Sequence, residues 1–201
     1  MEYVDQKFDF LTKLICSNNW ESMSDDGSVK IEKTELKDSD IACFRASGFV
    51  NAPAEELLNL SCSIYDDELS VKKHDTDVSR YEIVEKLSDD SRLCYQVNSM
   101  PFPIWPRDLL YIQVVKNNED SYWIYMYSVE SPIRPRNDNQ YVRAVVNISA
   151  YGFVPQENGT LVYRIVHVDP SGSIPTYIIN NYATKTSKFI KYLQHIYPSS
   201  Q

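Results

Sequence analysis

The chain has 201 residues, 43% of them hydrophobic and 24% charged, and its formal net charge is −8. This length fits a single domain, residues 1–201, that is large enough to bury a sizeable core or to enclose a cavity. The acidic balance excludes a nucleic-acid binder, which needs a broad basic face, and it disfavours attraction of the whole molecule to anionic membranes.

The cysteines and histidines indicate a reducing compartment and no metal. Cys16, Cys43, Cys62 and Cys94 show neither a CxxC spacing nor the density of a small secreted scaffold. We therefore expect free thiols and a cytoplasmic protein. No apolar run is long enough to span a bilayer, and the N-terminal segment lacks the layout of a signal peptide. The three histidines have no metal-ligand spacing, so we expect no metal, no cofactor and no catalytic residue.

The first third of the chain predicts two helices and two strands. Apolar residues at helical spacing predict a short amphipathic helix, and Trp20, which follows it, is expected to anchor that helix to a sheet. Gly48 marks a bulge or a close approach of two backbones. The elements are a helix over about 5–17, strands over 29–36 and 41–50, and a helix that begins at Pro53 with Asn51 as its cap.

The rest of the chain predicts a run of hairpins and one long helix. Residues 62–78 are weakly patterned, and three strand pairs follow: 80–87 with 92–98, 108–116 with 121–130, and 140–154 with 160–169. The final helix runs from Pro175 to about His195, and Ile178, Ile179, Phe189, Ile190 and Leu193 give it an apolar side. An antiparallel meander closed by a terminal helix indicates an α+β fold.

Three motifs in order are similar to the START family of lipid-transfer domains (steroidogenic acute regulatory-related). They are PFP at 101–103 with PRD at 106–108, YVRA at 141–144, and DPSGSIP at 169–175. The resemblance runs from Trp20 to Leu193. It implies a helix-grip fold, in which a curved antiparallel sheet wraps around the C-terminal helix and encloses a lipid cavity. The chain departs from the family after the second helix, where residues 64–67 or 74–75 stand in for the usual Trp-Asp pair.

The resemblance also implies a function. We expect a monomeric, non-enzymatic carrier that holds one lipid of the phospholipid, sterol or ceramide class and touches membranes transiently. Polar Arg143, Asn147 and Ser149 favour a lipid with a headgroup, such as a phospholipid. One alternative is a lipid-sensing regulator of the same fold. Another is a cyclase- or hydrolase-type enzyme, which would need acid and base groups converging inside the cavity.

The strand that begins at Arg143 can be read in two phases. If Arg143 points inward, alternation sends Asn147, Ser149 and Tyr151 to the same face, a polar face suited to a headgroup. The opposite phase buries the more apolar set of Ala144, Val146 and Ile148 and leaves Arg143 solvated. The residues alone favour the apolar phase, whereas the resemblance implies that the arginine faces the cavity.

The remaining candidates each have a structural alternative. Asn98 lies where the family places a polar cavity residue, but it also fits a turn. Tyr125, Tyr127 and Tyr163 suit the wall of a lipid cavity or an ordinary sheet core. The resemblance places a lid at residues 130–140, a loop that contains Ile133. The resemblance implies that the lid and the final helix together gate the tunnel. The helix carries Ile179 on its apolar side. Its other side, with Lys185, Lys188 and Lys191, either faces a membrane or is simply solvated.

Overall fold

A computed structural model describes residues 2–37, 39–118, 120–172 and 174–198, and for residues 2, 3 and 176–182 it describes the backbone alone. Within these ranges the strands form one curved sheet in the order β1-β2-β3-β10-β9-β7-β6-β5-β4, with neighbours antiparallel, and β8 adds a short parallel pairing with β6. The strands are β1 Glu21–Asp25, β2 Val29–Thr34, β3 Cys43–Val50, β4 Val78–Lys86, β5 Ser91–Asn98, β6 Arg107–Asn117, β7 Tyr122–Ser128, β8 Val142–Arg143, β9 Val145–Gln156 and β10 Gly159–Asp169.

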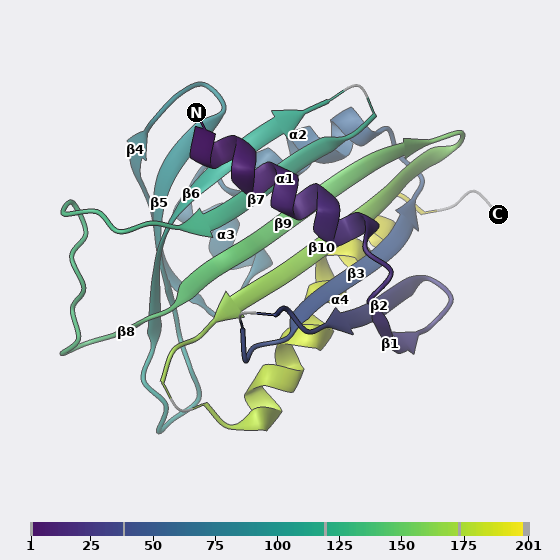
Figure 1. The fold of residues 1–201 in the computed structure, drawn as a ribbon. Coiled ribbons are helices and arrows are strands. Elements are labelled where there is room, and N and C mark those ends of the chain that lie inside the picture. Colours follow the sequence, from purple (N-terminus) through teal and green to yellow (C-terminus); the bar gives the residue numbers. More distant parts are fainter. Residues whose placement is uncertain (1, 38, 119, 173, 199–201) are drawn as a thin grey trace.

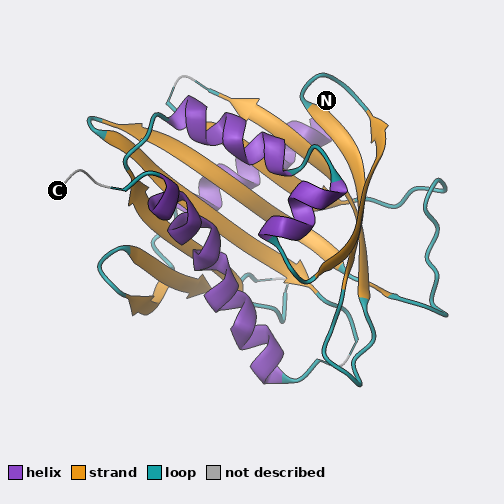
Figure 2. Cartoon of the chain, turned by 180° about the vertical axis from the view of Figure 1, so that it is seen from behind, coloured by secondary structure: helices purple, strands orange, loops and turns teal. Residues whose placement is uncertain are grey.

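Helices cover both faces of this sheet. They are α1 Glu2–Cys16, α2 Ala54–Ile64, α3 Glu68–His74 and α4 Thr176–Ile196. Figure 1 shows α1 lying across the outer face, and the view from behind shows α2, α3 and α4 together on the concave face (Figure 2). The expected α+β, helix-grip architecture is confirmed.

The N-terminal helix is fixed to the outer face by apolar contacts and one aromatic anchor. Phe8, Leu11 and Leu14 are buried in a cluster with the outward-facing aromatic residues of β7. Trp20 donates a hydrogen bond from Nε1 to the Leu14 carbonyl at 3.0 Å, and the Arg45 guanidinium lies 4.3 Å from its ring centroid. The prediction that Trp20 anchors this helix is therefore confirmed.

The C-terminal helix packs closely on β3 at Gly48. A Cβ built on Gly48 would lie 2.7 Å from the Ser28 carbonyl oxygen and 2.8 Å from Cγ2 of Ile190, so a larger residue would push α4 away. Gln194 secures the same contact, because its Nε2 donates to the carbonyls of Ser28 and Phe49. The close approach predicted at Gly48 is confirmed.

The predicted cap of the second helix is wrong. Pro53 occupies the N-cap position of α2 without a side-chain hydrogen bond, and Asn51 instead donates to the Pro198 carbonyl at 3.4 Å. Because the helix begins at Ala54, Asn51 lies too far upstream to reach its first amides. The weakly patterned region that follows contains α3, whose cap is Asp67, with Oδ1 accepting from the amides of Leu69 and Ser70.

Candidate functional site

A cavity of about 370 Å³ lies between the concave face of the sheet and the helices α3 and α4. Strands β5, β6, β7, β9 and β10 form its floor, and the ends of α2 and α3 close one side. Its volume falls at the low end of the range of roughly 300–1,000 Å³ that is usual for small-ligand pockets. Its apolar wall includes Ile64, Val71, Val78, Leu109, Met126, Ala144, Val146, Val166, Val168 and Phe189.

A bulge in β9 determines which of its residues reach this cavity. The register pairs His167 with Ile148 and Val168 with Val146, so Asn147 is an extra residue without a partner on β10. Because one inserted residue reverses the alternation of faces, Val146 lines the cavity before the bulge and Ser149 lines it after. Neither of the two predicted phases holds along the whole strand.

Three of the predicted site residues line the cavity, namely Asn98, Ser149 and Tyr151, whereas Asn147 does not. Tyr151 is held from both sides: its hydroxyl lies 2.7 Å from the Tyr65 hydroxyl, and its ring meets Phe189 edge-on at 4.6 Å. Burial raises the pKa of Tyr65 well above its usual value, so this hydroxyl stays neutral.

Asn98 belongs to a chain of hydrogen bonds along the cavity floor. The Tyr111 hydroxyl donates to Oε1 of Gln96 at 3.0 Å, and Nε2 of Gln96 donates to Oδ1 of Asn98 at 2.7 Å. All three residues line the cavity. The chain fixes the orientation of both amides, so one end of the floor offers a preorganised polar surface to a ligand.

Arg164 is the arginine that faces this cavity. Its guanidinium lies 4.2 Å from the centroid of the Tyr151 ring, and its Nη1 donates to Oγ of Ser149 at 2.9 Å. The same Nη1 also donates to the carbonyls of Ala150 and Ile165. Ring and hydrogen bonds together hold the guanidinium against the wall between β9 and β10.

A group of charged residues surrounds Arg164 at the α3 end of the cavity. Asp77 forms an ion pair with Lys185, and Asp75 lies next to them with its pKa raised by burial, which Lys185, Arg164 and Lys188 only partly oppose. The His74 ring meets Tyr192 edge-on at 4.6 Å, and burial, with a smaller effect of Lys73, lowers its pKa. This end of the cavity is therefore strongly polar.

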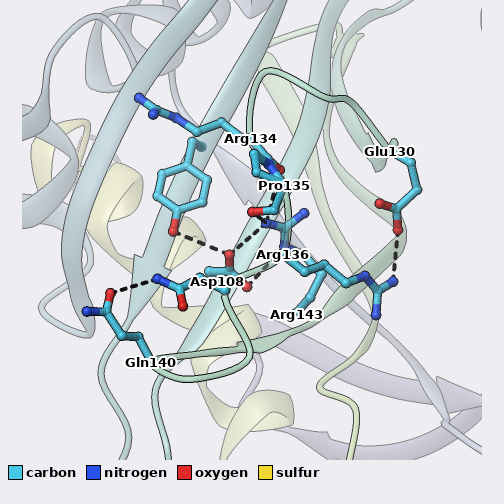
Figure 3. A network of polar contacts seen from close by, with 9 residues as sticks. Asp108, Glu130, Arg134, Pro135, Arg136, Gln140 and Arg143 are labelled. Atoms are coloured by element: carbon cyan, nitrogen blue, oxygen red, sulfur yellow. Dashed lines mark hydrogen bonds and ion pairs between the residues drawn. The ribbon is translucent and has the colours of Figure 1, made fainter.

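Arg143 lies elsewhere, in a buried network shown in Figure 3. Its Nε and Nη2 donate to the two carboxylate oxygens of Asp108 at 3.0 and 2.8 Å, and Nη2 also approaches the carbonyls of Arg134 and Pro135. Tyr95 completes the network by donating to Oδ2 of Asp108 at 3.3 Å. Arg143 does not line the cavity, so the expectation that it faces a headgroup is wrong.

Neighbouring Arg107 and Asp108 point to opposite faces of β6, as strand geometry predicts. Arg107 lines the cavity and donates to the carbonyls of Pro170 and Ser171, which fixes the entry to α4. Asp108 instead belongs to the outer face with Arg143. The two residues therefore tie the proline-containing segment to two different parts of the fold.

The tyrosines predicted for the cavity wall lie on the outer face. Tyr125 packs against Phe8 of α1 at 5.7 Å between ring centroids, and its hydroxyl donates to the Val4 carbonyl at 3.2 Å. Tyr127 and Tyr163 belong to the same outer cluster. None of the three lines the cavity. They lie on the opposite face of the sheet, which packs against α1.

The loop of residues 130–140 also lies on the outer face. Arg134 forms an ion pair with Glu82, and its guanidinium lies 5.5 Å from the ring centroid of Tyr95, a residue of the outer network. Ile133 is 52% exposed and, like the rest of the loop, is absent from the cavity lining. These contacts do not place a lid at the cavity. The Ile179 side chain lies outside the described residues.

The three lysines of α4 are all exposed, but their surroundings differ. Lys185 and Lys188 line the cavity, and Lys191 forms an ion pair with Asp26 at 2.6 Å. The charge of Lys191 is matched by Asp26, and a membrane-facing basic stripe stays a prediction. Within the described residues no three metal-ligating side chains gather, and no helix is both long and apolar enough to cross a membrane.

Sequence reasoning missed the charged end of the cavity. Arg164 shares the cavity face of β10 with Val166 and Val168, but Tyr163 and Ile165 make the opposite phase apolar too, so alternation does not identify the face of the arginine. Gln96 stands in the same phase as Asn98, two residues along β5. Asp75 and Asp77 fall in the weakly patterned region, where the sequence carries no periodicity that would place them.

Comparisons with known proteins agree with this geometry. The human ceramide transfer protein is 24% identical over 197 residues, which cover 86% of this chain and 31% of that protein, so the chain spans about a third of its length. Human StAR-related lipid transfer protein 5 superposes with a TM-score of 0.82 at 18% identity, covering 96% of this chain and 94% of that one. Human STARD10 gives 0.78 at 20% identity, covering 94% and 78%.

The match to a family model is nearly as long as the chain. The START domain model matches residues 11–195, a range that includes the curved sheet, all of the cavity floor and most of α4. The chain belongs to the START domain family.

Proposed function

We propose that this chain binds one lipid in the cavity and carries it between membranes without covalent chemistry. The observation that carries the proposal is the cavity itself, which has an apolar wall and a polar end under α3 and α4. Such a division fits an amphipathic ligand, because the acyl part is shielded from water while the headgroup keeps polar partners. The names of the relatives, ceramide transfer and lipid transfer proteins, support the same function.

We also propose that the lipid carries a headgroup, as a phospholipid does. The carrier is monomeric, and it contacts the membrane transiently. Polar groups at one end of the cavity support the headgroup. The four cysteines are free, which supports a reducing compartment such as the cytoplasm. Because α4 covers the cavity, entry of a lipid requires this helix to move, and we infer that the membrane surface promotes that movement.

Loading tests the carrier proposal directly. Purified protein is incubated with liposomes, reisolated and examined by native mass spectrometry for one bound lipid per chain. The variant Ala144→Trp fills the cavity floor, so it should stay folded yet take up at least tenfold less lipid. Ile83→Trp adds the same bulk at an exposed position of β4 and should load like the wild type. Absence of any bound lipid in the wild type would contradict the proposal.

A lipid-modifying enzyme is the second candidate, and one observation favours it. His74 and Asp75 are adjacent, line the cavity and have shifted pKa values, which is a common property of acid and base groups at active sites. Burial is the main cause of both pKa shifts. The His74 ring also packs edge-on against the Tyr192 ring. The mass of the lipid recovered after incubation separates the two functions: an unchanged mass supports a carrier, and a product lost in His74→Asn supports an enzyme.

A further inference from the structure

We propose that the cavity selects a lipid with a phosphomonoester headgroup, which Arg164 and Lys188 bind at the α3 end. This inference rests on the proposed lipid-binding function and names the class of its ligand. It concerns a different part of the molecule from the Arg143 network, which is closed by Asp108.

Charge is the first argument. Five basic side chains line the cavity, against the two carboxylates of Asp75 and Asp77, although the whole chain carries a net charge of −8. The basic residues are Lys73, Arg107, Arg164, Lys185 and Lys188. The three lysines are exposed, whereas Arg107 and Arg164 are not. Basic groups gathered around one cavity of an acidic protein create a local positive potential, which favours an anion.

The geometry of Arg164 is the second argument. All its hydrogen bonds to the described residues leave from Nη1, so the edge formed by Nε and Nη2 has no acceptor there. That edge presents two parallel N–H groups, the arrangement that binds two oxygens of one phosphate. Stacking on Tyr151 fixes the plane of the guanidinium, so little entropy is lost when an anion binds.

The neighbours of Arg164 are the third argument. Lys188 lines the same cavity and forms no ion pair within the described part of the chain, whereas Lys185 is matched by Asp77. The second carboxylate at this end, Asp75, is shared among three cations, because Lys185, Arg164 and Lys188 all attract it. A dianionic phosphate therefore meets more positive than negative charge beside Arg164 and Lys188.

Three lipids that share one oleoyl chain and differ only in headgroup test this inference. They are lysophosphatidic acid, a phosphomonoester; lysophosphatidylcholine, a zwitterion; and monoolein, which is neutral. A single chain suits a cavity of about 370 Å³. Loading from an equimolar mixture, read by native mass spectrometry, should favour lysophosphatidic acid at least tenfold over monoolein, as expected for charge-assisted hydrogen bonds to phosphate.

The variants Arg164→Gln and Lys188→Gln should each reduce this preference about tenfold while monoolein loading stays unchanged. Lys191→Gln, one turn further along α4 and outside the cavity, is the matched control and should keep the preference. Lys188 is exposed, so its variant remains informative if Arg164→Gln fails to fold. Equal loading of the three lipids by the wild type, or an unchanged preference in both variants, would overturn the inference.

A second arm separates a lipid headgroup from free phosphate. Inorganic phosphate is added at the same concentration as lysophosphatidic acid, and the thermal unfolding midpoint is measured. We expect a clear rise with the lipid and little with phosphate alone, and an equal rise would show a free-phosphate site instead. If no lipid of any class loads, the carrier function itself fails, which is distinct from equal loading of all three.

Discussion

Arg143 and Asp108 form a two-pronged ion pair on the outer face of the sheet, with side chains only 4% and 2% exposed. The parallel pairing of β8 with β6 sets them directly opposite each other. The pair therefore joins the short strand β8 to the main sheet, and it is separated from the cavity by the sheet itself.

Breaking this pair from one side should be costly. Asp108→Ala leaves the Arg143 charge buried without its partner, so we expect the free energy of unfolding to fall by about 3–5 kcal/mol. Urea unfolding followed by circular dichroism measures it. Glu130→Ala, which removes the exposed ion pair with Arg136, is the control and should change stability by less than about 1 kcal/mol. Equal effects of the two variants would show that Arg143 finds other partners.

Much of the fold could be predicted from the sequence because local signals agree with it. Turn residues separate the hairpins, and helical periodicity marks α1 and the described part of α4, so the predicted ranges of these elements differ from the observed ones by a few residues. The short strand β1 is not predicted, and the single strand predicted over 140–154 divides into β8 and β9. Strand β1 is exposed at all five positions, so no apolar alternation marks it.

The cavity was harder to predict, for two physical reasons. The bulge at Asn147 reverses the faces of β9, and an extra residue leaves no mark on the apolar pattern that surrounds it. Helix α1 also makes the outer face apolar, so alternation along β7 could not tell Tyr125, which packs under α1, from Met126, which lines the cavity. The tertiary arrangement, not the local sequence, decides which face lines the cavity.

Gly152 of β9 provides room for the ring of Trp123 on the neighbouring strand β7. A Cβ at Gly152 would overlap the six-membered part of that ring, and Trp123 is only 3% exposed. We expect Gly152→Ala to lower the free energy of unfolding by about 1–3 kcal/mol through overpacking. Thermal or urea unfolding checks this value.

A second substitution identifies the cause. Trp123→Leu removes the ring that clashes, so Gly152→Ala should cost much less in that background than in the wild type, a coupling measured by a double-mutant cycle. Strictly additive effects of the two substitutions would show that the glycine serves backbone conformation and not the ring.

Tyr65 and Tyr151 connect the end of α2 to β9 through one hydrogen bond between their hydroxyls. Replacing either with Phe leaves the other hydroxyl without this partner. We expect Tyr65→Phe to cost about 0.5–1.5 kcal/mol of stability. In a cycle with Tyr151→Phe, the double variant should cost less than the sum of the single variants. No coupling between the two sites would show that water replaces the lost partner.

Asp75 should make stability depend on pH in the direction opposite to most carboxylates. Burial raises its pKa above the ordinary value of 3.8, so folding favours the protonated acid. The stability that this group contributes is present in full below pH 3.8 and is lost as the pH rises through the folded-state pKa. At neutral pH the folded state therefore bears the cost of a partly desolvated charge, reduced by attraction to Lys185, Arg164 and Lys188.

Asp75→Asn removes that cost while keeping the oxygen that accepts from the Asp77 amide. We expect the variant to be more stable than the wild type in urea at pH 7.5, and this gain to shrink toward zero as the pH falls below 3.8. Asp89→Asn is the control: Asp89 is fully exposed and its pKa is lowered by Lys86, so its replacement should give no gain at pH 7.5. A loss of stability in Asp75→Asn at pH 7.5 would mean that attraction to the three cations outweighs burial, and that Asp75 stays charged in the cavity.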